Sequence, residues 1–351
     1  DSGETLMGGP ETKPLTEEEE RAYRLADNQL NALTGVDMDI VIPELKLLSL
    51  EMVRLTGFDE NLILETTEDN PDLSMIGKPK TKEGDIYELG PHKLVCGDST
   101  KAETYKLLLG EEKARLIYTD PPYGVDYVPM GDGNYDNIEK KIMGDDKTPA
   151  QTKVFFIEVL KQLQGVTTND VSIYWWYANS MAEENYSAFR ETGWKVSQTV
   201  MWLKNGMIYS PGQNFHRVYE PCIVGWKNGE ARYINRAFTN MTELWTVGDQ
   251  KKFSDYLDVW YQKRDPTNKY IHPTQKPVQL AERALKRSSE KGDIVLDAFA
   301  GSSSTLIACE QLERRFRGIE LDPKFVDAGV SRWCKYKDTK EIIKNGEKIT
   351  W

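Results

Sequence analysis

Hydrophobic and polar residues follow two different patterns along this chain. Over residues 15–64 the apolar positions have helical spacing, which predicts one helix that ends before Gly35 and a second that ends near Gly57. The stretch that follows is rich in proline, glycine and charge, as is typical of a linker. We therefore expect a helical segment over residues 1–72 and a linker over residues 73–84.

From residue 85 onward, apolar runs of strand length alternate with amphipathic runs of helix length. This alternation predicts an α/β fold with a mostly parallel, doubly wound sheet that helices cover on both faces. The expected elements are a hairpin over 85–98, strands over 114–120, 171–178, 195–204, 220–227, 293–299 and 315–321, helices over 154–163, 180–191, 276–289, 303–314 and 323–337, and an irregular stretch over 228–271.

Composition narrows the class of protein. Hydrophobic side chains make up 39% of the 351 residues and aromatic ones 10%, which is enough for a sizeable core. No apolar run approaches the roughly 18 residues of a membrane-spanning helix. The four cysteines form no CxxC pair, which argues against a disulfide framework or a zinc site and fits a reducing cytoplasm.

Charge is distributed unevenly. The formal net charge of −11 at first argues against a nucleic-acid partner. However, residues 1–72 hold 18 acidic and 5 basic residues, whereas residues 195–287 hold 15 basic and 8 acidic ones. A local basic region matters more for phosphate contacts than the total charge does. Surface lysines scattered by chance would give the same count, so charge alone leaves both interpretations open.

The segment DIVLDAFAGSSSTLIACEQL has the pattern of a strand, a turn of small residues and a helix. Ala300 and Gly301 let a ligand approach the backbone, and the helix offers free N–H groups. Glu320 follows Gly301 by nineteen residues, at the end of the next strand, where an acid can bind a ribose diol. An ordinary βα turn would look similar. GxGxxG and GxxxxGK[ST] are absent, which argues against a nicotinamide cofactor and against ATP hydrolysis.

A second turn follows the strand ARLIYTD. Asp120 is succeeded by Pro121, Pro122, Tyr123 and Gly124, which predicts a rigid turn at the carboxyl edge of the sheet, where α/β proteins bind ligands. The carboxylate can accept a hydrogen bond and the tyrosine ring can stack. This combination suits an exocyclic amine on a planar base.

These motifs resemble those of the amino-methylating DNA methyltransferases, which transfer a methyl group from S-adenosylmethionine to N6 of adenine or N4 of cytosine. DPPYGVDY is similar to their catalytic motif, LDAFAGSSSTLIA and GIELDPKF to their cofactor motif, and HPTQKPVQLAERAL to the segment before the cofactor strand. The resemblance covers about residues 85–337. The order of the motifs resembles the permuted β group, in which a target-recognition region separates the catalytic and cofactor halves. It implies a Rossmann-like methyltransferase domain over 85–351, with this region at about 205–271.

The resemblance implies roles for matching residues. The catalytic residues would be Asp120, Pro121, Pro122 and Tyr123. The cofactor-binding residues would be Asp98, Asp120, Lys276, Asp297, Phe299, Gly301, Ser302, Ser303 and Glu320. Ala298 and Ser303 stand where the family usually has proline and glycine, which leaves the affinity for the cofactor open.

The segment VMWLKNGMIYSPGQNFHRVYEPCIVGWKNG also resembles a subgroup common in phages and prophages, in which a ParB-like nuclease domain often precedes the methyltransferase. LTEEEERAYRLADNQLNAL resembles the tail of such a domain, without the part that bears nuclease motifs. We expect no nuclease activity. The segment would serve as a helical cap, a dimer contact or a linker.

Other candidate chemistry is weaker. His92, His216 and His272 have no ligand spacing, so we expect structural or DNA-contacting roles and no metal. Cys222 follows a proline but lies in an expected strand, so methylation of a ring carbon is not predicted. The loop over 125–147 either closes over a base that leaves the duplex or is a surface loop. DNA contacts are expected from Arg217, Arg232, Arg236, Lys251, Lys252, Lys263 and Arg264.

The sequence thus predicts a cytoplasmic, site-specific DNA adenine-N6 methyltransferase that uses S-adenosylmethionine. An acid at the first position of the turn resembles the adenine enzymes more than the cytosine enzymes. Cytosine-N4 methylation, an RNA substrate and a catalytically inactive DNA-binding module are the alternatives. DNA is the expected partner and a membrane is not. A homodimer and a restriction enzyme partner stay open.

Overall fold

The computed structural model of the chain describes residues 15–31, 38–69, 79–125, 145–208, 214–235, 257–264 and 275–351. Contacts divide the chain into two compact units, Asp1–Glu65 and Thr66–Trp351. The predicted loop over 125–147 lies largely outside the described residues, as do His272 and three of the predicted DNA-binding residues, Arg236, Lys251 and Lys252.

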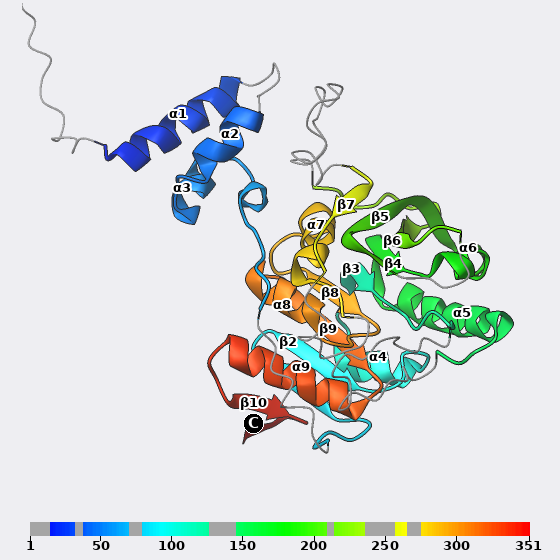
Figure 1. The fold of residues 1–351 in the computed structure, drawn as a ribbon. Coiled ribbons are helices and arrows are strands. Elements are labelled where there is room, and N and C mark those ends of the chain that lie inside the picture. Colours follow the sequence, from blue (N-terminus) through cyan, green and yellow to red (C-terminus); the bar gives the residue numbers. More distant parts are fainter. Residues whose placement is uncertain are drawn as a thin grey trace, which may run out of the picture. The chain divides into compact units, whose positions relative to one another are not determined.

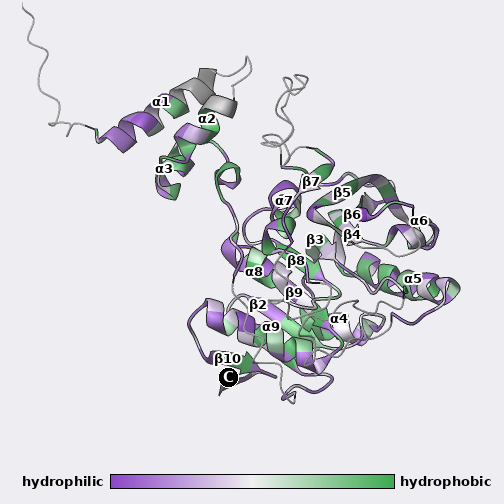
Figure 2. Ribbon diagram, viewed as in Figure 1, coloured by the Kyte–Doolittle hydropathy of each residue, from purple (hydrophilic) through white to green (hydrophobic). Residues whose placement is uncertain are grey.

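The first unit is helical, as the spacing predicted. It contains α1 (Glu17–Asn31), α2 (Met38–Leu45), α3 (Leu50–Leu55) and the 3-10 turn η1 (Glu60–Leu62). Four glutamates open α1 and make its start hydrophilic (Figure 2). The single helix predicted to end near Gly57 is wrong, because Ser49 interrupts it and caps α3 by accepting a hydrogen bond from the Met52 N–H at 3.4 Å.

The second unit contains one mixed sheet. Its described strands run in the order β11-β10-β1-β2-β9-β8-β3-β4-β6-β5-β7. The five central strands from β2 to β4 are parallel, and antiparallel pairs lie toward both edges. The strands are β1 (Ile86–Leu89), β2 (His92–Cys96), β3 (Ala114–Thr119), β4 (Thr167–Trp176), β5 (Trp194–Ile208), β6 (Arg217–Lys227), β7 (Val259–Tyr261), β8 (Ile294–Asp297), β9 (Arg315–Glu320), β10 (Glu341–Lys344) and β11 (Glu347–Thr350).

Helices cover both faces of this sheet (Figure 1). On one face lie α7, α8 and α9, and on the other lie α4, α5 and α6. Their bounds are α4 (Ala102–Leu109), α5 (Pro149–Gly165), α6 (Ala182–Glu191), α7 (Val278–Ser288), α8 (Ser304–Gln311) and α9 (Pro323–Tyr336). This arrangement is the doubly wound α/β fold that the alternation of strands and helices predicted.

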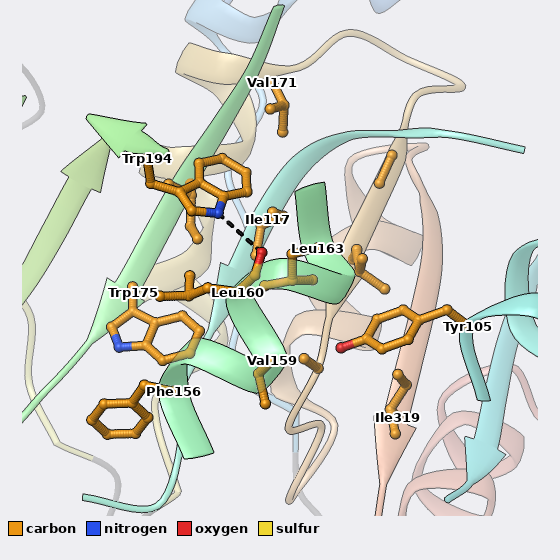
Figure 3. Close-up of a cluster of buried hydrophobic side chains, with 14 of the residues drawn as sticks. Tyr105, Ile117, Phe156, Val159, Leu160, Leu163, Val171, Trp175, Trp194 and Ile319 are labelled. Atoms are coloured by element: carbon orange, nitrogen blue, oxygen red, sulfur yellow. Dashed lines mark hydrogen bonds between the residues drawn. The ribbon is translucent and has the colours of Figure 1, made fainter. Parts of the chain in front are cut away.

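A hydrophobic core fills the space between the sheet and helices α4, α5 and α6 (Figure 3). Phe156 of α5 contacts the Trp175 ring of β4 edge to face, with ring centroids 5.5 Å apart. The Trp194 indole N–H donates to the Leu160 carbonyl at 3.1 Å, so this large ring is buried with its polar atom satisfied. These contacts pack α5 against the end of β4 and the start of β5.

Thr66 and Asp69, which fall in the predicted helical segment over 1–72, belong to the second unit and bond to its helices. Thr66 donates through its N–H and hydroxyl to Glu282 at 2.6 and 2.7 Å. Both guanidinium edges of Arg332 contact Asp69, at 2.7 and 2.5 Å. These contacts fix the residues before the sheet onto helices α7 and α9. Among the described residues no helix is both long and apolar enough to cross a membrane.

Candidate active site

The predicted catalytic turn lies at the carboxyl end of β3. The Tyr123 hydroxyl donates to Asp120 Oδ1 at 2.7 Å, so the ring and the carboxylate hold each other. Gly124 has a φ of +70°, and a Cβ there would lie 2.2 Å from the Thr152 hydroxyl of α5. Only glycine fits this position, and its N–H donates to Asp145 at 2.7 Å. The turn therefore has one fixed conformation.

Lys276 joins this turn from the segment before α7. Its ammonium contacts Asp120 Oδ2 and lies 3.2 Å from the Tyr123 hydroxyl. It also lies 5.2 Å from the centre of the Trp176 ring. Burial lowers the pKa of Lys276, but the carboxylates of Asp120 and Glu220 outweigh this effect and raise it above the ordinary value. The side chain therefore carries its charge inside the site.

Two charged residues that the sequence did not single out complete this cluster. Glu220 of β6 lies 3.5 Å from the Lys276 ammonium, and its other oxygen contacts Lys204 of β5. Burial alone would raise the pKa of Glu220, but the two lysines lower it to about 2. Glu220 is therefore ionised at any physiological pH. An acid directly before an apolar strand, as in YEPCIVGW, was the available signal.

The ends of β3 and β8 are tied together by Asp297. Its carboxylate accepts from the hydroxyls of Thr119 and Thr305, both at 2.8 Å, and from the Phe299 N–H at 3.1 Å. Burial raises the pKa of Asp297 to about 6. The turn after β3 and the small-residue turn are thereby fixed at neighbouring positions on the carboxyl edge of the sheet. Asp297 acts here by holding the backbone.

Glu320 lies where the ribose acid was predicted, at the end of β9. Its two oxygens accept from the backbone N–H groups of Gly301, at 2.7 Å, and Asp322, at 2.8 Å. Burial raises its pKa to about 7 against the effect of these hydrogen bonds. Asp98 follows the neighbouring strand β2, and its Oδ1 accepts the N–H and hydroxyl of Thr100 at 2.8 Å. The structure thus brings these two acids to the same edge.

The small-residue turn has a second support in α9. Arg332 donates to the Ser302 carbonyl at 2.6 Å and to the Ser304 hydroxyl at 3.1 Å, and Ser304 in turn donates to the Lys276 carbonyl at 2.6 Å. Ser303 is fully buried, and its hydroxyl is directed at Gly329 of α9. Its side chain therefore lies in the helix interface, so only its backbone can face a ligand at the turn. The ring of Phe299 contacts Phe155 and Trp175 of the core, with centroids 5.7 and 6.3 Å away.

These residues fit a nucleoside cofactor. Each Glu320 oxygen accepts one backbone N–H and keeps a lone pair for a ribose hydroxyl. The turn beside it is built from small residues and leads into α8. Glu320 and Asp98 would hold the nucleoside part, while the turn at Gly301 and the Lys276 segment would lie near the methionine part. Fold and site together fit the class of methyltransferases that act on amino groups.

Comparison with known proteins names the family. Residues 114–331 match the family of DNA methylases called N6_N4_Mtase. The chain therefore belongs to this family of DNA methylases, and its cofactor is S-adenosylmethionine.

Two type II methyltransferases and one solved structure illustrate the similarity to known proteins. The type II methyltransferase M2.DpnII of Streptococcus pneumoniae is 28% identical over 245 residues, which cover 64% of this chain and 85% of the relative. M2.LlaDCHI of Lactococcus lactis subsp. cremoris is 26% identical over 251 residues, with coverage of 67% and 88%. The structure of the cytosine-N4-specific PvuII DNA methyltransferase superimposes with a TM-score of 0.55 at 16% identity, over 74% of this chain and 94% of that one. This likeness shows that the fold is that of a Rossmann-like methyltransferase.

The structure separates the predicted DNA-binding residues. Arg217 and Lys263 are exposed near the ends of β6 and β7. Arg264 is partly buried, and its backbone N–H donates to Asn205 at 3.1 Å. Arg232 packs on the Trp226 ring at 4.0 Å, and the neighbouring Tyr233 N–H donates to Asp170 in the first half of β4, which is the far end of the sheet from Asp120. Arg232 is therefore not brought to the site.

Two residues of weaker candidate chemistry have structural roles. The Phe316 N–H donates to His92 Nδ1 at 3.0 Å, so the opposite ring nitrogen donates to Glu310 at 2.9 Å. His92 thus joins β2 to β9 and α8. Cys222 is fully buried in β6, and burial raises its thiol pKa well above the ordinary value. It belongs to the core, as the sequence predicted, and carries no thiolate for attack on a base.

Proposed function

We propose that this protein transfers a methyl group from S-adenosylmethionine to the exocyclic N6 of adenine at a specific DNA sequence. The observation that carries the proposal is the carboxylate of Asp120, held by Tyr123 at the carboxyl end of β3, next to the small-residue turn after β8. The acid at the first position of this turn favours adenine over cytosine. The curated relatives are type II methyltransferases, which supports a sequence-specific DNA substrate.

The mechanism relies on positioning and electrostatics. The nitrogen lone pair of an aminopurine is delocalised into the ring, so its attack needs precise alignment and stabilisation of the charge that develops on nitrogen. Asp120 would accept a hydrogen bond from the amine and direct the lone pair toward the methyl donor. The Tyr123 ring would stack on a base that has left the duplex. S-adenosylmethionine, when bound, supplies an electrophilic methyl group.

The order of strands supports an in-line arrangement. Because β3 and β8 are neighbours, and Thr119 donates to Asp297 at 2.8 Å across them, the base-binding turn and the cofactor turn keep a fixed separation. Gly301 and Glu320 would bind the cofactor on the β8 side. The exposed side chains of Arg217, at the start of β6, and Lys263, just after β7, would contact DNA phosphates.

The test is direct detection of the modified base. The protein is expressed in a bacterial strain that lacks its own DNA methylation, and the genomic DNA is sequenced by a method that reads N6-methyladenine and N4-methylcytosine. We expect N6-methyladenine at one short sequence, and a loss of at least about 100-fold in rate for Asp120→Ala. N4-methylcytosine at that sequence would refute the adenine assignment, and the parental rate in Asp120→Ala would refute the role of the carboxylate.

A further inference from the structure

Four side chains of alternating charge form a continuous chain through the site. They are Asp120 after β3, Lys276 before α7, Glu220 of β6 and Lys204 of β5, each in contact with the next. Lys276 and Lys204 are the most deeply buried, with side chains 8% and 2% exposed. The formal charges of these four side chains sum to zero. Family motifs account for Asp120 and Lys276 but leave Glu220 and Lys204 without a role.

Lys276 contacts the carboxylate that would accept the substrate amine in the proposed function. Asp120 Oδ1 already accepts the Tyr123 hydroxyl at 2.7 Å, and Oδ2 accepts the Lys276 ammonium. Both are nitrogen or oxygen donors of the kind that an exocyclic amine would be. Oδ2 keeps a second lone pair, but an amine that binds there comes directly beside the Lys276 ammonium, which already donates to the same oxygen. Separating a buried ammonium from its carboxylate partner is strongly unfavourable unless a second carboxylate receives the ammonium.

We propose that Lys276 occupies the position of the target amine until a base enters, and that Glu220 then receives the displaced ammonium. This inference rests on the proposed function. No covalent bond changes and no proton moves, because Lys276 only exchanges one carboxylate partner for the other. Glu220 is thus a positioning residue that acts through Lys276.

Three features of the structure suit Glu220 to this role. Its Oε2 lies only 3.5 Å from the ammonium, so the exchange needs a small movement of one side-chain end. Its low pKa, about 2, keeps the accepting carboxylate charged. Lys204 fixes the other oxygen, and its own ammonium lies 4.6 Å from the centre of the Trp202 ring, which pairs with Glu220 in the β5–β6 register. The receiving carboxylate is therefore held in place before the base arrives.

The alternative is that the cluster only stabilises the fold. In that case Glu220→Gln would lower the melting temperature but leave each folded molecule fully active. The exchange predicts a different pattern. With Glu220 neutral, Lys276 has no second carboxylate and stays on Asp120, so base entry is blocked. Replacing Lys276 in the Glu220→Gln protein removes the ammonium from Asp120, so the base can enter again.

The experiment compares Glu220→Gln, Lys276→Met and the double variant in the full chain. Methyl transfer from tritiated S-adenosylmethionine to unmethylated genomic DNA gives kcat and KM, and this substrate contains the target whichever amine is methylated. Calorimetric titration with S-adenosylmethionine counts competent sites, so kcat is expressed per competent site. The control is Glu282→Gln, which removes a carboxylate 2.6 Å from Lys286 in another partly buried pair, with side chains 14% and 9% exposed.

We expect Glu220→Gln to lower kcat at least tenfold, with KM for DNA and affinity for S-adenosylmethionine within about threefold of the parent. The double variant should recover at least fivefold over Glu220→Gln and exceed Lys276→Met, in which Asp120 faces Glu220 with no cation between them. Glu282→Gln should change kcat less than twofold. Parental kcat in Glu220→Gln, or a double variant no better than that single variant, would overturn the exchange while leaving the proposed function intact. A parent that methylates no DNA would overturn both.

Discussion

Ser303 occupies a position whose backbone suits glycine. Its φ of 58° and ψ of 32° lie in the left-handed region, directly before α8. Within the described part of the chain its buried hydroxyl has no hydrogen-bond partner. It contacts α9 at Gly329, where an added Cβ would lie 2.3 Å from the hydroxyl oxygen and 3.1 Å from the Ser303 Cβ. Ser303→Gly should therefore stabilise the protein.

The magnitude follows from three terms. Relief of the left-handed conformation contributes about 1 kcal/mol. Removal of a buried hydroxyl without a partner contributes about 1–3 kcal/mol. Two effects of Ser303→Gly oppose this gain by about 1–2 kcal/mol: glycine is freer in the unfolded chain, and the serine side chain no longer packs against α9. The net expectation is a gain of about 1–2 kcal/mol in the free energy of unfolding, or about 2–4 °C in Tm for a unit of this size.

Gly329→Ala supplies the matched test of this geometry. In the parent it should cost about 1–3 kcal/mol, because the new Cβ collides with Ser303. In the Ser303→Gly protein the collision with the hydroxyl is gone. Only the contact with Leu94 Cδ2 at 3.2 Å stays, and the higher helix propensity of alanine offsets it, so the same change should be neutral within about 0.5 kcal/mol. Denaturant unfolding of the four proteins gives the coupling energy. An unchanged or lower stability of Ser303→Gly, or equal costs of Gly329→Ala in both backgrounds, would refute the reasoning.

Three further predictions concern cofactor and DNA. Because burial raises the pKa of Glu320 to about 7, and ribose hydroxyls need the ionised form as acceptor, affinity for S-adenosylmethionine should fall about tenfold from pH 8 to pH 6 in calorimetry. Glu320→Gln should bind more weakly and lose that pH dependence, and the same slope in both proteins would contradict the role. Asp69→Asn should lower the free energy of unfolding by about 1.5–3 kcal/mol, because Asp69 holds Arg332 against the small-residue turn. It should also weaken S-adenosylmethionine binding severalfold. Unchanged affinity in calorimetry would show that Arg332 does not support the cofactor site. Arg217→Ala should reduce the slope of log DNA affinity against log salt concentration by about 0.9. Lys348→Ala, on β11 at the opposite edge of the sheet, should leave the slope unchanged. The same slope in Arg217→Ala and in the parent would show that DNA does not contact Arg217.

The sequence was sufficient for the parts of the site that local signals encode. The turn after β3 and the small-residue turn after β8 are contiguous motifs at strand ends, and Glu320 follows at the spacing of one βα unit. Parallel strands then bring their carboxyl ends to one edge, so no further information was needed to predict that these residues meet. Asp120 and Glu320 lie on that edge as expected.

Other residues depend on pairing that the sequence does not state. Glu220 and Lys204 reach the site through the antiparallel register of β5 and β6, and Asp69 through its contact with Arg332, 263 residues later. The acid beside the apolar run in YEPCIVGW marks Glu220, but neither the β5–β6 register nor the contact of Asp69 with Arg332 has a local signal.

Some elements were missed although a signal was present. The hairpin of β10 and β11 turns at Asn345 and Gly346, with φ values of 52° and 84°, as Asn-Gly dipeptides do in tight hairpins. Helix α5 begins at Pro149, five residues before its predicted start, because Thr148 and Gln151 form a capping box. The helix α4 is only eight residues long and has a weak apolar pattern.

The pairing of β3 with β8 also has a consequence for how the protein folds. Thr119 and Asp297, whose hydrogen bond links the two turns, are 178 residues apart in the chain. β2 and β9 are also neighbours, with Cys96 opposite Glu320. Closing such long loops is slow, so proteins rich in distant contacts fold slowly. The two turns can meet only after β8 and β9 have left the ribosome, so the proposed S-adenosylmethionine site forms late in folding. A nascent chain that stops between β7 and β8 would hold the complete catalytic turn and yet have no site to bring a methyl donor to it.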